Sequence, residues 1–358
     1  MAKKYIKGFD GLRSYSILLV IITHLGFAHS FAEGSYLRDR VFYFFSGVAG
    51  VNIFFALSGF LITTLILAEY DKTGRFNVLN FFIRRFLRLL PPILPFYLAL
   101  AIFMSLGYVR ETYWGLLASV FYLYNYVPKA KILYSTELSH TWSLAVEEQF
   151  YLMWAFLFAK VSKKAVEKTL WVLLLGCVLA SYILPGLPIN IKGEDYLLGD
   201  VFFVMRWTLP AIGPILIGSL LALWQHRNFG NIRERFASSR WGWIAFLVFL
   251  CPFYIPDFLV PIMRMLHATG ASLLLVWILN NQTHKVVGAL EWSPLRYIGT
   301  ISYGLYIWQG FFVRTGPDFT PKIWVHDPPV NVLLTFAVAI VSYELYEKKV
   351  LALKKKFY

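Results

Sequence analysis

The sequence predicts an all-α polytopic integral membrane protein, a bundle of about ten transmembrane helices. Three observations predict this class: 58% of the 358 residues are hydrophobic, only 15% are charged, and apolar runs of about 20 residues recur along the whole chain. A soluble domain carries about 25% charged residues. A run of about 20 apolar residues, by contrast, is long enough to cross a bilayer as a helix. We therefore expect a multi-pass protein of the inner (cytoplasmic) cell membrane.

The predicted spans are joined by short connections, so residues 1–358 are expected to form a single membrane-embedded domain with no appended soluble domain. The spans are 12–31, 41–68, 89–109, 142–159, 170–184, 201–225, 241–256, 259–280, 297–315 and 330–347. Lysine and arginine concentrate in alternate connections, and cytoplasmic loops carry the excess of these residues. Both termini are therefore expected in the cytoplasm. The same bias accounts for the net charge of +14, so no nucleic-acid partner is expected.

The apolar segment 112–127 does not fit this alternation. It is short, and counting it as a span would move the lysine-rich connection after residue 159 to the outside. We expect it to be an outer re-entrant or interfacial segment, which is tolerated where protein or a water-filled cavity shields the backbone. Cys177 and Cys251 lie in apolar segments and predict no disulfide framework.

Two ionisable residues lie within the first predicted span. Arg13 and His24 are eleven residues apart. On a helix they would lie within about 20° of each other and about 16 Å apart along the axis. Ionisable side chains in a membrane helix are costly and mark a pathway or a functional site. A single histidine is as often an inter-helix hydrogen-bond partner, so the interpretation depends on the other polar clusters.

The second polar cluster lies at the entrance to the third predicted span. Arg85 and Arg88 are one helical turn apart, so their guanidinium groups can converge on one target. The planar guanidinium fork matches phosphate oxygens, which favours a phosphate-bearing ligand. Anchoring to lipid headgroups is the alternative.

The third cluster opens the fourth predicted span with polar and acidic residues: His140, Trp142, Ser143, Glu147, Glu148 and Tyr151. A central acidic residue costs roughly 2.5–3.5 kcal/mol on the membrane-insertion scale unless it is paired or hydrated. Glu147 shares a helix stripe with Tyr151, whereas leucines flank Glu148 at four-residue spacing. We expect Glu147 to face the site and to meet His24 at one depth, with Glu148 as the second candidate.

Five motifs, in order along the chain, resemble those of the membrane-bound acyltransferase family 3. They are Asp10-Gly11-Leu12-Arg13 followed by His24, Ser58-Gly59-Phe60-Leu61, Arg85-x-x-Arg88, Trp142-Ser143-Leu144-x-x-Glu147-Glu148-Gln149-Phe150-Tyr151, and Ile301-Ser302-Tyr303-Gly304-Leu305-Tyr306. The resemblance extends from residue 8 to about residue 347. The sequence departs at Ser14, where relatives often have glycine or alanine, and at Gln309, where many have histidine.

The resemblance implies ten transmembrane helices and transfer of an acyl group, often acetyl, from cytoplasmic acyl-CoA (acetyl-CoA) as co-substrate. It implies acceptor hydroxyls on surface polysaccharides, lipid-linked saccharides, peptidoglycan or macrolides. We expect Arg85, Arg88 and Arg13 to bind the donor, and His24 to act as general base, oriented by Glu147. A covalent acyl-histidine route is the alternative chemistry.

Six residues are candidates for substrate binding: Trp142, Ser143, His140, Tyr151, Arg206 and Arg264. For the two arginines, and for His267 one turn from Arg264, a neutralised structural pair is as frequent as a role in substrate binding. His29 is expected at the membrane–water interface. The seven histidines predict no metal site. Two other functions are open: acylation of a cytoplasmic small molecule such as a macrolide, and proton-coupled transport or lipid flipping with His24 and Glu147 as a relay.

Overall fold

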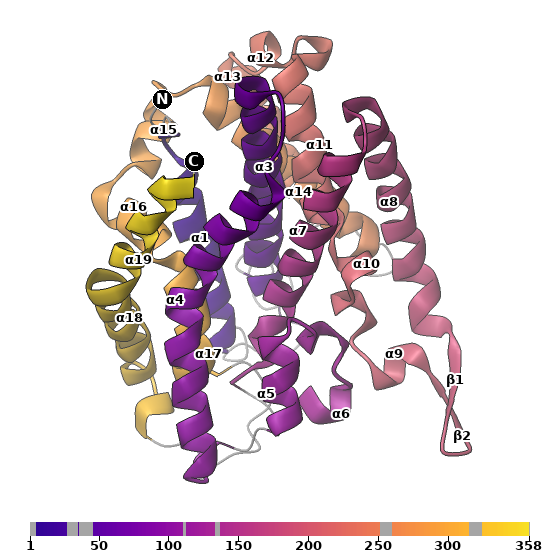
Figure 1. Cartoon of the computed structure of the whole chain (residues 1–358), viewed down its shortest axis with the longest axis vertical. Helices are drawn as coiled ribbons and strands as arrows, with labels where there is room; N and C mark the ends of the chain where they lie inside the picture. The colour runs from indigo at the N-terminus through magenta and orange to yellow at the C-terminus, as the bar shows by residue number, and fades with distance from the viewer. Residues whose placement is uncertain are drawn as a thin grey trace. The chain divides into compact units, whose positions relative to one another are not determined.

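The computed structural model describes residues 5–26, 35, 46–109, 112–132, 137–250, 260–314 and 324–357. Within these residues the chain is almost wholly helical, as predicted (Figure 1). Five helices within the described ranges are long and apolar enough to cross a membrane: Gly47–Thr73, Val78–Ser105, Ala165–Gly186, Pro261–Asn280 and Val330–Ala352. The helical membrane class is confirmed, whereas the count of ten spans and the cytoplasmic termini stay predictions.

The chain divides into two compact units. Unit 1 comprises residues 1–76, 161–179 and 212–302, and unit 2 comprises residues 77–160, 180–211 and 303–358. The α-helices of unit 1 are α1 Phe9–His24, α3 Gly47–Thr73, most of α8 Lys163–Ile183, α11 Gly213–Arg227, α12 Ile232–Arg235, α13 Ser239–Leu250, α14 Val260–Asn280, α15 Lys285–Leu290 and α16 Ser293–Thr300.

Unit 2 combines long helices with several short ones. Its α-helices are α4 Val78–Ser105, α5 Tyr113–Val120, α6 Lys129–Ile132, α7 Trp142–Lys160, α9 Leu198–Val201, α10 Thr208–Ala211, α17 Ser302–Phe312, α18 Val330–Ser342 and α19 Lys348–Ala352. Its 3-10 helices include η3 Tyr124–Tyr126, η4 Ser139–Thr141, η6 Val204–Arg206 and η12 Leu353–Phe357, and residues 343–347 form a π-helix.

Unit 1 is built around α3, which packs against α1, α11 and α14. The Ser46 hydroxyl accepts the Ala49 amide at 3.2 Å and caps the start of α3, and Gly74 ends the helix at φ 71°. Glycines allow α3 and α11 to pack closely. A Cβ on Gly59 would lie 2.8 Å from the Ile215 carbonyl carbon, and one on Gly218 would lie 3.0 Å from the Ala56 carbonyl carbon. Small residues are typical of helix contacts in membranes, because they let backbones approach.

In unit 2, α4 begins eleven residues before the predicted span, at Val78 instead of residue 89. The side chain of Asn77 accepts the Asn80 amide at 2.9 Å and caps the helix there. The arginine-bearing turn is thus continuous with the membrane helix. Three prolines, Pro91, Pro92 and Pro95, lie within α4, which membrane helices tolerate more readily than soluble ones.

The predicted span 201–225 is wrong as a single helix. The chain there forms η6 and α10 before α11 begins at Gly213. Pro210 and Pro214 each lack an amide proton, and Gly213 is a weak helix former, so a continuous ladder is disfavoured. The predicted span 297–315 is likewise divided into α16 and α17 at Ile301.

Two connecting segments, 112–127 and the hairpin after α8, differ in how far the sequence predicted their structure. The segment 112–127 forms the short helices α5 and η3, and its outer re-entrant or interfacial position stays a prediction. The hairpin of β1 Pro188–Ile191 and β2 Glu194–Leu197 was not predicted (Figure 1). Lys192 and Gly193 form its two-residue turn with φ of 53° and 91°, the left-handed conformation that such turns require. The predictions for Cys251 and His29 fall outside the described residues.

Candidate functional site

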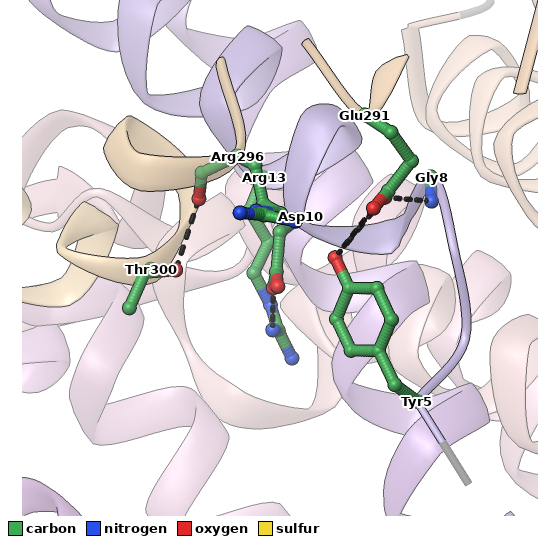
Figure 2. Close-up of polar contacts among 7 residues, drawn as sticks. All are labelled: Tyr5, Gly8, Asp10, Arg13, Glu291, Arg296 and Thr300. Atoms are coloured by element: carbon green, nitrogen blue, oxygen red, sulfur yellow. Dashed lines mark hydrogen bonds and ion pairs between the residues drawn. The ribbon is translucent and has the colours of Figure 1, made fainter. Parts of the chain in front are cut away.

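In unit 1, α1 carries both ionisable residues of the first motif. Arg13 donates to Asp10 at 2.7 Å, and the two side chains remain 20% and 17% exposed (Figure 2). His24 is the last residue of the same helix and is half-buried. A single helix thus holds Arg13 and His24 on one stripe, as the spacing predicted. The Asp10 partner of Arg13 was not predicted, although an (i, i+3) charge pair can be read from a sequence.

The N-terminus of α1 is fixed by a carboxylate from the connection between α15 and α16. Glu291 accepts the Gly8 amide at 2.6 Å and the Tyr5 hydroxyl at 3.0 Å (Figure 2). A carboxylate in this position satisfies an unpaired helix amide and interacts favourably with the helix dipole. Burial, together with the carboxylates of Asp10 and Glu291, raises the pKa of the Tyr5 phenol.

In unit 2, α4 and α7 bring Arg85 and the acidic pair together. Arg85 donates from Nη2 to Oε1 of Glu148 at 3.2 Å, with side chains 13% and 17% exposed. Its guanidinium carbon lies 3.3 Å from the ring centroid of Tyr151. The Tyr151 hydroxyl in turn donates to Glu147 at 3.1 Å. Arg85, Glu148, Tyr151 and Glu147 therefore form one connected polar cluster, which we call the α4–α7 cluster.

The α4–α7 cluster contains four of the predicted site residues. Arg88 is exposed, whereas Arg85 donates to Glu148. Both arginines act electrostatically on Glu148, and a common phosphate target for the two guanidinium groups stays a prediction. Glu148, the second candidate from sequence, is the acid paired with Arg85. Glu147 contacts Tyr151, its predicted stripe neighbour. Because His24 belongs to unit 1 and Glu147 to unit 2, their meeting stays a prediction.

A second polar group lies at the start of α7. The Ser143 hydroxyl and the Tyr306 hydroxyl are 2.5 Å apart, and the Tyr306 hydroxyl donates to the His140 carbonyl at 2.9 Å. All three residues are buried. The His140 ring packs edge-on against Tyr306, with ring centroids 5.4 Å apart. Two of the predicted substrate-binding residues are thus held together by Tyr306 of α17.

Arg206 and Trp142 also meet in unit 2. The Arg206 guanidinium lies 5.5 Å from the Trp142 ring centroid and 4.3 Å from that of Phe203, and it donates to Ser139 at 3.4 Å. A cation above aromatic faces is a common way to hold an arginine in an apolar setting. Arg264 lies half-buried on α14 of unit 1. Arg206 and Arg264 belong to different units, and their role in substrate binding stays a prediction.

The sequence also matches known proteins over nearly all of its length. Residues 6–347 match the model of a family described as an acyltransferase domain. The chain belongs to acyltransferase family 3. It is therefore a membrane acyltransferase, and the resemblance inferred from its five motifs is confirmed.

Curated members of the family are distant in sequence. The chain is 27% identical to the protein YrhL of Bacillus subtilis, which it covers to 55% with 97% of its own length. It is 27% identical to the peptidoglycan O-acetyltransferase OatA of Listeria monocytogenes (97% of this chain, 56% of the relative). It is 28% identical to the O-acetyltransferase OatA of Staphylococcus aureus (96% and 57%). The chain thus spans about half the length of these relatives. No solved structure matches it.

Some residues that shape the polar groups of this family member were not predicted. Tyr306 lies within a matched motif, so its position in the sequence could have identified it. Arg314 and Glu137 form a buried ion pair at 3.4 Å across 177 residues of sequence, and no local pattern indicates such a pair. Among the residues that the structure describes, no group of three or more His, Cys, Asp or Glu side chains is arranged to hold a metal ion.

Proposed function

We propose that this acyltransferase moves an acyl group, acetyl in the first instance, from cytoplasmic acyl-CoA to a sugar hydroxyl of a surface polysaccharide or lipid-linked saccharide. The match to the acyltransferase family over residues 6–347 carries the proposal. The names of the relatives favour acetyl as the group and peptidoglycan, a surface glycan, as the kind of acceptor. The enzyme would act as one domain of ten spans in the cytoplasmic membrane, with both termini in the cytoplasm.

The donor role falls to the arginines. Exposed Arg88 can reach a phosphate directly, while Arg85 shares its guanidinium with Glu148. Five N–H donors allow an arginine to hold a carboxylate and a phosphate oxygen together. In this proposal Arg88 binds the phosphates of coenzyme A, and Arg85 contributes a second guanidinium group to them. Arg13 binds the arm of the donor that carries the thioester.

The acceptor role falls to His24 and Glu147. The neutral imidazole of His24 takes the proton from the sugar hydroxyl as that oxygen attacks the thioester carbonyl. Glu147 stabilises the imidazolium that forms, and Tyr151 holds Glu147 through its hydroxyl at 3.1 Å. As the C–S bond breaks, the imidazolium gives its proton to the coenzyme A thiolate, which leaves as the thiol and returns His24 to its neutral form. Arg206, whose guanidinium lies over the Trp142 and Phe203 rings, binds the sugar or its phosphate linkage in this proposal.

Mass spectrometry of surface glycans with and without the protein tests the proposed reaction. The proposal expects an acetyl ester on the glycan only when the protein is present, and unchanged glycan in both samples would overturn it. Binding of coenzyme A to the purified chain tests the donor site and separates it from a transporter, which needs no thioester. Arg88→Gln should weaken this binding by about tenfold, as for the loss of one charge-assisted contact. Arg75→Gln, an exposed arginine before α4, is the matched control.

A further inference from the structure

The apolar surface of unit 2 is hollowed where α4 packs against the 3-10 helix η12. The groove has a volume of about 440 Å³ and is almost wholly apolar. Ile83, Phe86 and Leu87 line it from α4, and Leu353 and Phe357 line it from η12. This volume lies within the range of about 300–1,000 Å³ that is typical of ligand sites.

The groove adjoins a dense cluster of positive charge. Lys356 lines it, and its side chain is exposed. Five of the nine residues 348–356 are lysine, and they lie at and just beyond the end of Val330–Ala352, the last of the described helices that is long enough to span a membrane. One of the five, Lys348, is paired with Glu344 at 3.1 Å. Lysine clusters next to a membrane helix attract anionic lipid headgroups.

A side-chain hydrogen bond holds the two walls of the groove together. Nη1 of Arg84 donates to the Phe357 carbonyl at 2.7 Å, which ties η12 to α4. The groove is therefore part of the packed structure of unit 2. Its walls come from helices of one unit, so its shape depends on that unit alone.

We propose that this groove binds one anionic phospholipid of the membrane. One acyl chain lies against Phe86, Leu87 and Leu353, and the headgroup phosphate is held by the ammonium group of Lys356. An uncharged or zwitterionic lipid carries no net negative charge to complement the exposed Lys356. A free phosphate, in turn, has no apolar part to fill the groove. An anionic lipid uses both features.

The lipid site is independent of the proposed acyl transfer. At about 100° per residue, Arg85 and Arg88 lie roughly 130–170° around α4 from the middle of the groove face. Arg85 is directed to Glu148 of α7. A substitution in the groove therefore leaves the α4–α7 cluster in place, and the inference stands whether or not the proposed reaction is correct.

Native mass spectrometry of the full chain in detergent tests the proposal. The probes are dioleoyl phosphatidylglycerol, dioleoyl phosphatidylcholine with the same chains, and inorganic phosphate. The variants are Lys356→Gln, which removes the charge, and Leu87→Trp, which fills the groove. Lys285→Gln, an exposed lysine at the start of α15 in unit 1, is the matched control.

We expect saturable binding of phosphatidylglycerol that phosphate does not displace and that phosphatidylcholine does not match. Lys356→Gln should weaken it by about fivefold, from the contribution of one lysine near a lipid surface. Leu87→Trp should abolish it, and Lys285→Gln should not change it. Equal binding of the two lipids, displacement by phosphate, or unchanged affinity in Lys356→Gln would overturn the proposal. Lys356→Gln decides alone if Leu87→Trp fails to fold, because Lys356 is exposed.

Discussion

Gly310 on α17 provides a sharp test of the packing around His140. A Cβ at this position would overlap the His140 imidazole and would lie 2.7 Å from the Glu137 carbonyl oxygen. Relieving such an overlap in a packed core typically costs about 1–3 kcal/mol. Alanine also gains about 0.8–1.0 kcal/mol over glycine within a helix. Gly310→Ala is therefore expected to lower the free energy of unfolding by up to about 2 kcal/mol.

Gly304, on the same helix, is the matched control for this substitution. The atoms nearest to a Cβ there would be Oε1 of Glu347 at 3.5 Å and Cβ of Ala339 at 3.6 Å, which is ordinary van der Waals contact. Gly304→Ala keeps the gain in helix propensity without the overlap, so it should leave the protein as stable or more stable. The difference between the two variants isolates the overlap, about 1–3 kcal/mol.

Thermal unfolding of the detergent-purified variants measures this difference. Each kcal/mol shifts the unfolding temperature by about 2–4 °C in a unit of 150–250 residues. Gly310→Ala should therefore unfold about 2–12 °C below Gly304→Ala. It should also reduce acyl transfer, because His140 is held with Ser143 through Tyr306. Equal unfolding temperatures would show that the His140 ring does not pack against Gly310.

Three further predictions concern other parts of the structure. Arg85→Leu and Glu148→Gln should each destabilise the protein by about 3–5 kcal/mol. A double-mutant cycle, measured by unfolding, should give a coupling energy of about 0.5–3 kcal/mol between the two side chains. Additive losses would mean that they do not interact. Gly59→Ala should destabilise unit 1 by about 1–3 kcal/mol, because its Cβ would meet the α11 backbone; an unchanged unfolding temperature would contradict this packing. Because the pKa of Tyr5 is raised, its contribution to stability is complete below the unfolded pKa of about 10 and is lost as the pH rises further. Above pH 10, wild type should therefore lose stability more steeply than Tyr5→Phe, and parallel curves would show that the pKa of Tyr5 is not raised in the folded protein.

The sequence predicted features that depend on local pattern. Long apolar runs indicated helices, and the spacing of Arg13 and His24 placed both on α1. Tyr151 beside Glu147 also follows from four-residue spacing. The motifs identified the family, because each requires specific residues within a few positions of one another.

The sequence did not predict the contacts between residues that are far apart along the chain. Glu148 was ranked second because leucines flank it on the helix, but α4 supplies Arg85 from 63 residues away. Helical spacing describes only one helix and does not specify what packs against it. The break before α11 is different, since Pro210 and Pro214 were visible, but the apolar composition of the segment favoured one continuous span.

The most direct measurement of the central claim is acetyl transfer by the reconstituted chain with a histidine replaced. Proteoliposomes that contain wild type, His24→Ala or His284→Ala would receive labelled acetyl-CoA on one side and a glycan acceptor. His284 is a control of the same type, since it caps α15 through its side chain, which accepts the Val286 amide. If His24 is the general base, His24→Ala should lose about 10²–10⁴-fold in rate with donor binding intact, and His284→Ala should transfer normally. Near-normal transfer by His24→Ala would contradict the proposed mechanism.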